Sequence, residues 1–232
     1  MRIVSYNVHA CVGSDGRFAP ERIAEVLAAL NADFVALQEV EDREVDGTPV
    51  SAYLARRLGL HAYPGPTLKR RDADYGNLLL AKPEATAVTR HEISVPGREP
   101  RGIIEADFCA HDVDLRLLVT HLGLSGAERK KQLDLLLTVI DREGADVLVL
   151  AADFNEWAPA AGLHRQLGRR FGTSTRHKTF PAPLPVLSLD RIYVSPPHAL
   201  QSSGVERSTL ARNASDHLPV VCELALAARS GS

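Results

Sequence analysis

Six short segments constrain the fold of this chain more than any other feature, because each sets a polar side chain at or just beyond the end of an apolar run. The segments are Tyr6-Asn7-Val8, Leu37-Gln38-Glu39-Val40, Thr120-His121-Leu122, Ala152-Asp153-Phe154-Asn155, Leu189-Asp190-Arg191-Ile192-Tyr193 and Ser215-Asp216-His217-Leu218-Pro219. Short apolar runs of this kind are typical of buried β-strands. Since a rigid scaffold can gather strand ends at one edge, we expect these amide, carboxylate and imidazole groups to form one site.

The composition is that of a soluble globular protein, with 45% hydrophobic and 24% charged residues. The chain shows no linker, short-period repeat or low-complexity block, so we predict one domain over residues 1–227 and a flexible tail over residues 228–232. Its apolar runs stay below the ~18–20 residues that span a bilayer, and we recognise no signal peptide. The three cysteines are far apart and fit buried reduced thiols. We therefore expect a cytoplasmic protein.

The net charge of −2 excludes a protein that is held on DNA mainly by its charge. Local basic clusters remain, at Lys69-Arg70-Arg71, Arg129-Lys130-Lys131, Arg169-Arg170 and Arg176-His177-Lys178. Such clusters are usually solvated surface. They permit contact with a polyanion such as DNA or RNA without requiring it.

The order of the expected elements favours an α/β fold. Strands are predicted at 2–8, 34–37, 77–81, 103–110, 115–120, 147–151, 189–194 and 220–226, and helices at 21–30, 50–58, 127–142 and 159–170. The three prolines between residues 180 and 186 indicate an ordered loop. Because the order strand–helix–strand occurs in both halves, we predict two sheets covered by helices.

Glu39 and Asn7 are candidate ligands of a metal ion. Mg²⁺ prefers one or two carboxylate oxygens, with water and substrate phosphate filling the rest of its shell. Glu39 ends an apolar strand, and the Asn7 amide could add an oxygen directly or through water. The alternatives are a solvated strand-end carboxylate and an asparagine that bonds the backbone.

Asp153 and Asn155 follow the apolar run at 147–152. In an extended strand, a spacing of two residues points both side chains to the same side. One carboxylate can then orient or deprotonate a water while the amide donates to a phosphate oxygen. The alternative is a turn-forming Asp-x-Asn sequence.

His217 follows Asp216 at the start of another apolar run. A histidine acts as a general base, or as a cationic phosphate ligand, when a carboxylate fixes its tautomer. Asp190, on the preceding strand, is the expected partner. His121 could donate to phosphoryl oxygens or protonate the leaving group. A single histidine at a strand end is more often structural.

Three further residues are candidates for the wall of the site. The planar guanidinium of Arg101 could clamp a phosphate, although many arginines in this context are surface residues. Tyr75 and Asn77 lie at the start of a predicted strand and could shape the wall.

In this order, the segments closely resemble the endonuclease/exonuclease/phosphatase superfamily, which shares the fold of pancreatic deoxyribonuclease. The resemblance runs from Arg2 to about residue 226, and its most specific parts are LQEV at Glu39, DFN at 153–155 and SDHLP at 215–219. It is strongest to small stand-alone bacterial members. It implies a four-layered α/β sandwich, in which two mixed β-sheets pack face to face with helices on the outside.

The resemblance also implies roles. Glu39 is the expected principal metal ligand with Asn7 beside it, and Asp216 lies near the metal or its waters. Asp153 and Asn155 engage the attacking water and the scissile phosphate. Asp190 orients His217. His121 matches the histidine of the deoxyribonuclease, sphingomyelinase and phosphatase branches, which argues against abasic-site repair.

The chain departs from pancreatic deoxyribonuclease at one position. That enzyme supports its equivalent of His121 with a glutamate, where this chain offers Asn77. An amide stabilises a cationic imidazole less than a carboxylate does. The protonation state of His121 is therefore open.

The expected activity is hydrolysis of a phosphate ester with one or two Mg²⁺ or Mn²⁺ ions. The general base is either Asp153 or the Asp190–His217 pair, and the sequence does not choose between them. A nuclease or other phosphodiesterase comes first, and a lipid or sugar-phosphate phosphodiesterase or phosphatase second. We expect a monomer with no obligate protein partner and no stable membrane insertion. Two other classes are a serine hydrolase using Ser125, which lacks the full G-x-S-x-G motif, and an inactive binding module.

Overall fold

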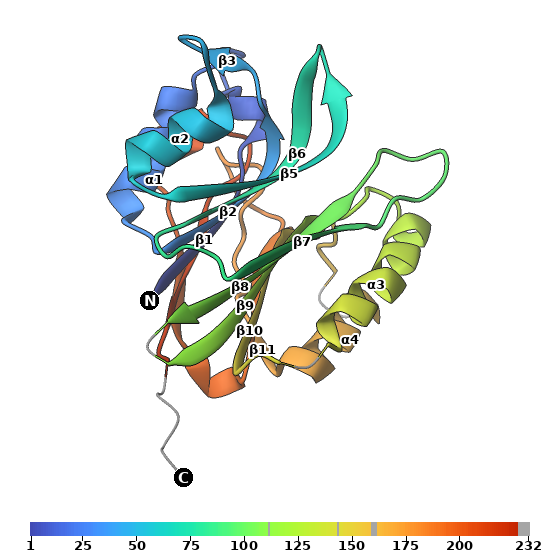
Figure 1. Ribbon diagram of the computed structural model, residues 1–232. Helices are drawn as coiled ribbons and strands as arrows, with labels where there is room; N and C mark the ends of the chain where they lie inside the picture. Colours follow the sequence, from blue (N-terminus) through green and yellow to red (C-terminus); the bar gives the residue numbers. More distant parts are fainter. Residues whose placement is uncertain (111, 143, 159–161, 227–232) are drawn as a thin grey trace.

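Two six-stranded sheets pack face to face, and helices cover their outer faces (Figure 1). The computed structural model describes residues 1–110, 112–142, 144–158 and 162–226. Figure 1 shows α1 and α2 outside the first sheet and α3 and α4 outside the second. Both sheets are mixed, so the predicted four-layered α/β sandwich is confirmed. The predicted tail at residues 228–232 lies outside the described residues.

The first sheet has the strand order β13-β14-β1-β2-β6-β5 and the second has the order β11-β12-β10-β9-β8-β7. The strands of the first are β1 (Arg2–Asn7), β2 (Phe34–Glu41), β5 (His61–Arg70), β6 (Ala73–Ala81), β13 (Leu200–Val205) and β14 (Val220–Leu224). Those of the second are β7 (Ala87–Glu92), β8 (Gly102–Ala110), β9 (Val113–His121), β10 (Val147–Asp153), β11 (Thr173–Ser174) and β12 (Asp190–Ser195). A separate ribbon pairs β3 (Glu44–Val45) with β4 (Thr48–Pro49).

The helices are α1 (Pro20–Leu30), α2 (Val50–Leu58), α3 (Gly126–Ile140), α4 (Gly162–Phe171) and α5 (Thr209–Ala214), with 3₁₀ turns η1 (His9–Cys11) and η2 (Pro197–Ala199). Helix α1 matches the helix predicted at 21–30 and begins one residue earlier, at Pro20; Asn31, which follows it, has a left-handed φ of 44°. Helix α3 ends at Ile140, two residues before the predicted boundary, because the apolar stripe that packs on the sheet ends there. None of the helices in the described ranges is both long and apolar enough to cross a bilayer.

Each sheet has one parallel strand pair at its centre, and the other neighbouring strands are antiparallel. Strand β1 runs parallel to β2, with Asn7 beside Gln38. Strand β9 runs parallel to β10, with His121 beside Asp153. The carboxyl ends of each pair therefore lie together at one edge of their sheet, which is where the chemical side chains begin.

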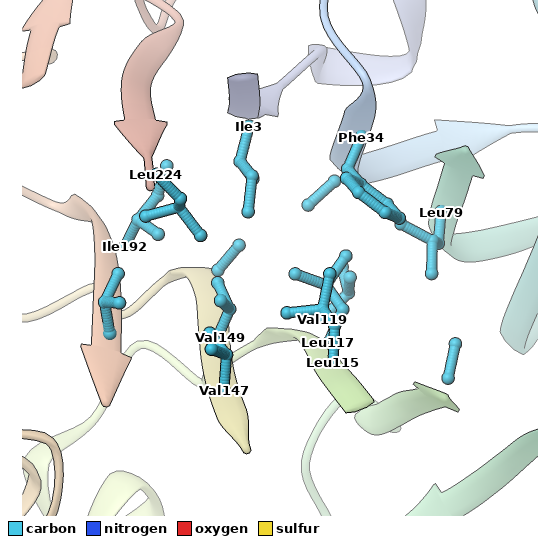
Figure 2. Close-up of a cluster of buried hydrophobic side chains, with 14 of the residues drawn as sticks. Ile3, Phe34, Leu79, Leu115, Leu117, Val119, Val147, Val149, Ile192 and Leu224 are labelled. Atoms are coloured by element: carbon cyan, nitrogen blue, oxygen red, sulfur yellow. The ribbon is translucent and has the colours of Figure 1, made fainter. Parts of the chain in front are cut away.

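The two sheets are held together by interdigitating apolar side chains (Figure 2). Ile3, Phe34 and Leu79 come from the first sheet, and Leu117 and Val149 come from the second. All five are fully buried. Alternate residues of the same strands face the outer helices, so the central strands are buried on both sides and read as continuous apolar runs. Full burial of one such side chain stabilises the fold by about 1.5–3 kcal/mol.

We expect Phe108→Ala to lower the free energy of unfolding by about 3–5 kcal/mol. Phe108 is 1% exposed, and its ring packs edge-on against Phe34 with centroids 4.9 Å apart, across the two sheets. Leu135→Ala, at a side chain that is 44% exposed on α3, should change it by less than about 0.5 kcal/mol. Urea unfolding followed by circular dichroism measures both; equal values for the two variants would contradict the packing account.

Candidate functional site

The strand ends of both sheets converge on one polar site, which is buried on one side and partly exposed on the other. Its floor is formed by side chains that are almost completely buried: Asn7, His121, Asp153, Asp190 and His217. The side of the site that faces solvent, called the opening below, is formed by Glu39, Asp216 and His9, whose side chains are 22%, 41% and 49% exposed. The six segments supply eight amide, carboxylate and imidazole candidates; seven of them form this floor and opening, and Asn155, beside His121, is the eighth. His9 joins them, although sequence analysis did not single it out.

A β-bulge places Glu39 in the site. Leu37 pairs with Leu78 and Val40 pairs with Gly76, so two residues of β2 lie opposite Asn77 alone. Glu39 has a left-handed φ of 58°, which is unfavourable for a residue with a Cβ. Bulges of this kind re-aim a side chain, and left-handed non-glycine residues are held in place by the surrounding structure.

The Asn7 amide bridges two carboxylates from different sheets. Its Nδ2 donates to Glu39 Oε1 and to Asp153 Oδ2, at 3.0 Å in each case. Its Oδ1 accepts from the backbone N–H of His9. Burial favours the neutral acid of Glu39, but hydrogen bonds from His9 and Asn7 outweigh it and hold the pKa of Glu39 well below its usual range. Glu39 is therefore an anion at neutral pH.

Asp153 and Asn155 are brought to the site by a turn and not by a continuing strand. Asp153 ends β10, and its Oδ1 accepts from the backbone N–H of Asn155 at 2.9 Å. Asn155 has a left-handed φ of 50°. Its Nδ2 donates to the carbonyl of Leu122 at 2.8 Å and lies 3.0 Å from His121 Nε2. The pair therefore adopts the turn-forming Asp-x-Asn geometry that sequence analysis left as the alternative, and the argument from an extended strand does not apply to it.

His121 is held by an arginine. Arg101 Nη1 lies 2.9 Å from His121 Nδ1. Because a guanidinium can only donate, Nδ1 accepts from Arg101, which places the single proton of the neutral imidazole on Nε2. The contact between Nε2 and Asn155 Nδ2 is then a close approach of two N–H groups and not a hydrogen bond. Burial lowers the pKa of His121 to about 4, and Arg101 acts in the same direction against the opposing charge of Asp153.

The expected contact between Asn77 and His121 is absent from the hydrogen bonds of the described residues. Asn77 Nδ2 donates to the carbonyl of Gly102 at 3.1 Å. Arg101, the next residue back along the chain, takes the place beside the imidazole. Its Nη1 also lies 3.1 Å from Glu99 Oε1, so a carboxylate compensates the charge of the buried guanidinium.

The electrostatic environment of His217 is opposite to that of His121. Its Nδ1 bonds Asp190 Oδ2 at 2.8 Å, and its Nε2 lies 3.7 Å from Asp153 Oδ2. Burial alone would lower the pKa of His217, but the charge and hydrogen bond of Asp190 outweigh it and raise the pKa to about 10. Thr179 donates from its hydroxyl to the same Asp190 oxygen. The predicted Asp190–His217 pair is present in the structure.

The remaining candidates lie around this centre. Tyr75 is buried, and the guanidinium of Arg70 stacks over its ring at 3.7 Å. Arg70 also contacts Glu99, and Glu99 contacts Arg101, so Tyr75 is connected to Arg101 through these two ion pairs. Ser125 caps the start of α3 by accepting from the backbone N–H of Glu128, which is a structural role.

Three residues that sequence analysis passed over border the site. His9 Nδ1 lies 3.5 Å from Glu39 Oε2 and 3.7 Å from Asp216 Oδ2. Phe180 packs its ring 4.9 Å from the ring of His217, and Thr179 bonds Asp190. The only sequence signal for His9 is its place two residues after Asn7. Thr179 and Phe180 belong to the proline-rich loop, whose contacts no local pattern reveals.

Two sets of side chains could hold a divalent cation. Donor atoms of Asp153, Asp190 and His217 all lie within 4.8 Å of one another. However, Asp190 Oδ2 already accepts from Thr179 and His217, which leaves only the buried Oδ1 without a partner among the described residues. The second set is Glu39 and Asp216 at the opening, and its Glu39 is ionised and partly exposed. This second set fits a hard cation better than the first, because Mg²⁺ and Mn²⁺ keep several waters in their shell.

A family model for the endonuclease/exonuclease/phosphatase family matches residues 4–217. The chain belongs to this family. That membership agrees with the resemblance seen in the sequence, and it makes the strand-end site the place to look for phosphate-ester chemistry.

Individual proteins similar to this chain match it over nearly its whole length. YbhP, an uncharacterised protein of Escherichia coli, is 28% identical over 97% of this chain and 96% of its own length. A family member from Beutenbergia cavernae has a TM-score of 0.77 at 22% identity, over 97% of this chain and 71% of that one. The mannosyl-6-phosphatase Bt3783 of Bacteroides thetaiotaomicron has a TM-score of 0.79 at 18% identity, over 97% of this chain and all of that one (100%).

We expect Asp190→Asn to flatten the dependence of stability on alkaline pH. The folded protein keeps a proton on His217 that the unfolded chain loses between pH 6.5 and about 10. The pair's stabilisation is therefore fully present below pH 6.5 and is lost as the pH rises through 10, by up to about 1.4 kcal/mol per pH unit. Urea unfolding of chelator-treated protein across this range measures the slope; an unchanged slope in the variant would show that Asp190 does not control this proton.

Proposed function

We propose that this protein is a divalent-metal-dependent phosphoric ester hydrolase that cleaves a P–O bond by in-line attack of water. One observation carries the proposal. Carboxylates, an amide and two histidines in opposite protonation states converge at a single opening from strand ends of both sheets. Family membership supports the reaction class.

The residues at the opening would hold the cation. Glu39 is the principal ligand, with Asp216 and the Asn7 amide near it. When bound, a Mg²⁺ or Mn²⁺ ion neutralises charge on the phosphoryl oxygens and the leaving group. The Asn7 contacts also keep the Glu39 and Asp153 carboxylates close together on the same side of the site.

Different side chains bind the phosphate and accept the proton of the attacking water. His217 is positively charged at neutral pH, so it serves as a cationic phosphate ligand and leaves Asp153 as the base that orients and deprotonates the water. Asn155 and the neutral His121 donate to phosphoryl oxygens. Arg101 fixes the His121 tautomer from behind. One well-placed donor in such a site is worth about 3 kcal/mol, or ~100-fold in rate.

A phosphodiester is the first choice of substrate, with DNA and RNA among the candidates. The monoesterase alternative has support from Bt3783, which is described as a mannosyl-6-phosphatase and shares the fold. We place the reaction in the cytoplasm and in a monomer. All three cysteines are free thiols, two of them buried, which agrees with a reducing compartment.

We expect Glu39→Ala, Asp153→Ala and His217→Ala each to lower turnover at least ~100-fold without unfolding the protein. His198→Ala is the matched control, because His198 is an exposed histidine on η2 outside the site, and it should keep full activity. Steady-state kinetics with added Mn²⁺ and circular dichroism measure activity and folding. Near-normal turnover in a folded His217→Ala protein would overturn the assignment.

The substrate class requires a screen. Bis-p-nitrophenyl phosphate, a p-nitrophenyl monoester, single- and double-stranded DNA, RNA and phospholipids are offered with Mg²⁺ or Mn²⁺, and EDTA is the control. We expect EDTA-sensitive cleavage of the diester. Activity that survives EDTA but is lost with a serine-directed reagent would favour the serine hydrolase, and no cleavage of any substrate would favour the inactive binding module.

A further inference from the structure

Large apolar side chains are exposed mainly in the loops beside the site. We call four of them the apolar rim: Leu124, Trp157, Leu184 and Val186, with exposures of 77%, 59%, 73% and 53%. The described residues contain one other exposed large apolar side chain, Leu135 on α3, at 44%. Single exposed apolar residues are ordinary, but a group of them around an active site marks an interaction surface.

The first half of the rim lies on the loops that follow the parallel pair of the second sheet. Leu124 comes three residues after His121, and Trp157 comes two residues after Asn155. Arg129 joins the two loops, because its Nη1 donates to the carbonyl of Leu124 at 2.6 Å and its Nη2 to Glu156 at 2.7 Å. These two apolar side chains are therefore carried by loops that are tied to each other and to the site.

The second half lies on the proline-rich loop, which is anchored on the other side of the site. Ala182 donates its backbone N–H to the carbonyl of Asp216 at 2.7 Å, and the Phe180 ring packs on His217. Arg212 Nη1 holds the same loop through the carbonyls of Ala182 and Pro183. Leu184 and Val186 are thus exposed on an ordered loop that borders the catalytic pair.

The charges on the rim loops themselves are positive or paired, while the two carboxylates at the opening, Glu39 and Asp216, face His9. Lys130 and Lys131 are exposed at the start of α3, close to Leu124 in the sequence. Of the nearby carboxylates, Glu128 is buried and Glu156 is paired with Arg129. The stretch 176–189 contains three basic or histidine residues at its start and no carboxylate. Such a surface is complementary to an anionic partner that also accepts apolar side chains.

We propose that the apolar rim docks the active-site face on the surface of an anionic phospholipid bilayer, and that the substrate is a phosphate ester of a lipid head group. The substrate part rests on the proposed function. Three of the four rim residues are aliphatic and offer no π-face for a nucleobase, whereas all four can enter the acyl boundary of a bilayer. The binding is interfacial and involves no membrane-spanning segment.

Trp157 makes the docking directly measurable, because it is the only tryptophan in the chain. Its fluorescence is recorded in EDTA, so that no metal-dependent hydrolysis occurs, while vesicles of equal parts phosphatidylglycerol and phosphatidylcholine are added. We expect a saturable blue shift and quenching by brominated acyl chains. Pure phosphatidylcholine and high salt should weaken the response, because the lysines then gain less from the surface charge.

Matched variants separate docking from chemistry. Leu124→Ser and Leu184→Ser should each weaken vesicle binding at least ~10-fold, whereas Leu135→Ser, which removes the same side chain from α3, should leave it unchanged. Turnover of the soluble bis-p-nitrophenyl phosphate should stay the same in all three variants. Hydrolysis of vesicle lipids should fall with the two rim variants only.

The other outcomes overturn the whole proposal or the part of it that concerns the substrate. No spectral change with anionic vesicles, or equal losses in Leu124→Ser and Leu135→Ser, would overturn it. A response to single-stranded oligonucleotide but not to vesicles would assign the rim to nucleic acid. Because binding is measured without metal, vesicle docking without any esterase activity would refute the proposed function and leave the docking surface standing.

Discussion

The face-to-face packing of two parallel strand pairs is the constraint on which the site depends. The pairs β1–β2 and β9–β10 bring Asn7, Glu39, His121 and Asp153 to the same edge of the sandwich, and the apolar cluster between the sheets fixes the separation of those ends. The Asn7 amide also links the two sheets directly, because it donates hydrogen bonds to a carboxylate of each sheet. A catalytic group displaced by one ångström loses much of its effect, so a buried core is the natural support for such a site.

The same packing holds two histidines close to the Asp153 carboxylate, and these two histidines have opposite protonation states. His121 and His217 have Nε2 atoms 3.5 Å and 3.7 Å from Asp153 Oδ2, yet an arginine faces the far nitrogen of His121 and a carboxylate faces that of His217. Burial lowers both pKa values, and at His217 the charge and hydrogen bond of Asp190, helped by the charges of Asp153 and Asp216, reverse the effect. Environments that push two pKa values apart are how one site separates donor and base roles.

The central elements could be predicted because they follow from hydrophobic periodicity, and their order indicated two sheets covered by helices. The four-layered, face-to-face arrangement was implied by the family resemblance. The sequence did not predict β5, where Pro64, Gly65 and Pro66 interrupt the strand pattern at a sheet edge, or the left-handed turns at Glu39 and Asn155. The candidate residues were found because strand ends are visible in a sequence. Their partners were not: that Arg101 and not Asn77 would contact His121 depends on the register between β8 and β9, which no local pattern specifies.

The central claim is that Glu39 and its neighbours hold a cation on which turnover depends. The most direct measurement is a calorimetric titration of metal-free protein with Mn²⁺, run beside the rate of bis-p-nitrophenyl phosphate hydrolysis at each metal concentration. We predict saturable binding that rises in parallel with the rate, and an affinity at least ~10-fold lower in Glu39→Gln. Full turnover without metal, or equal affinity in Glu39→Gln, would contradict the account.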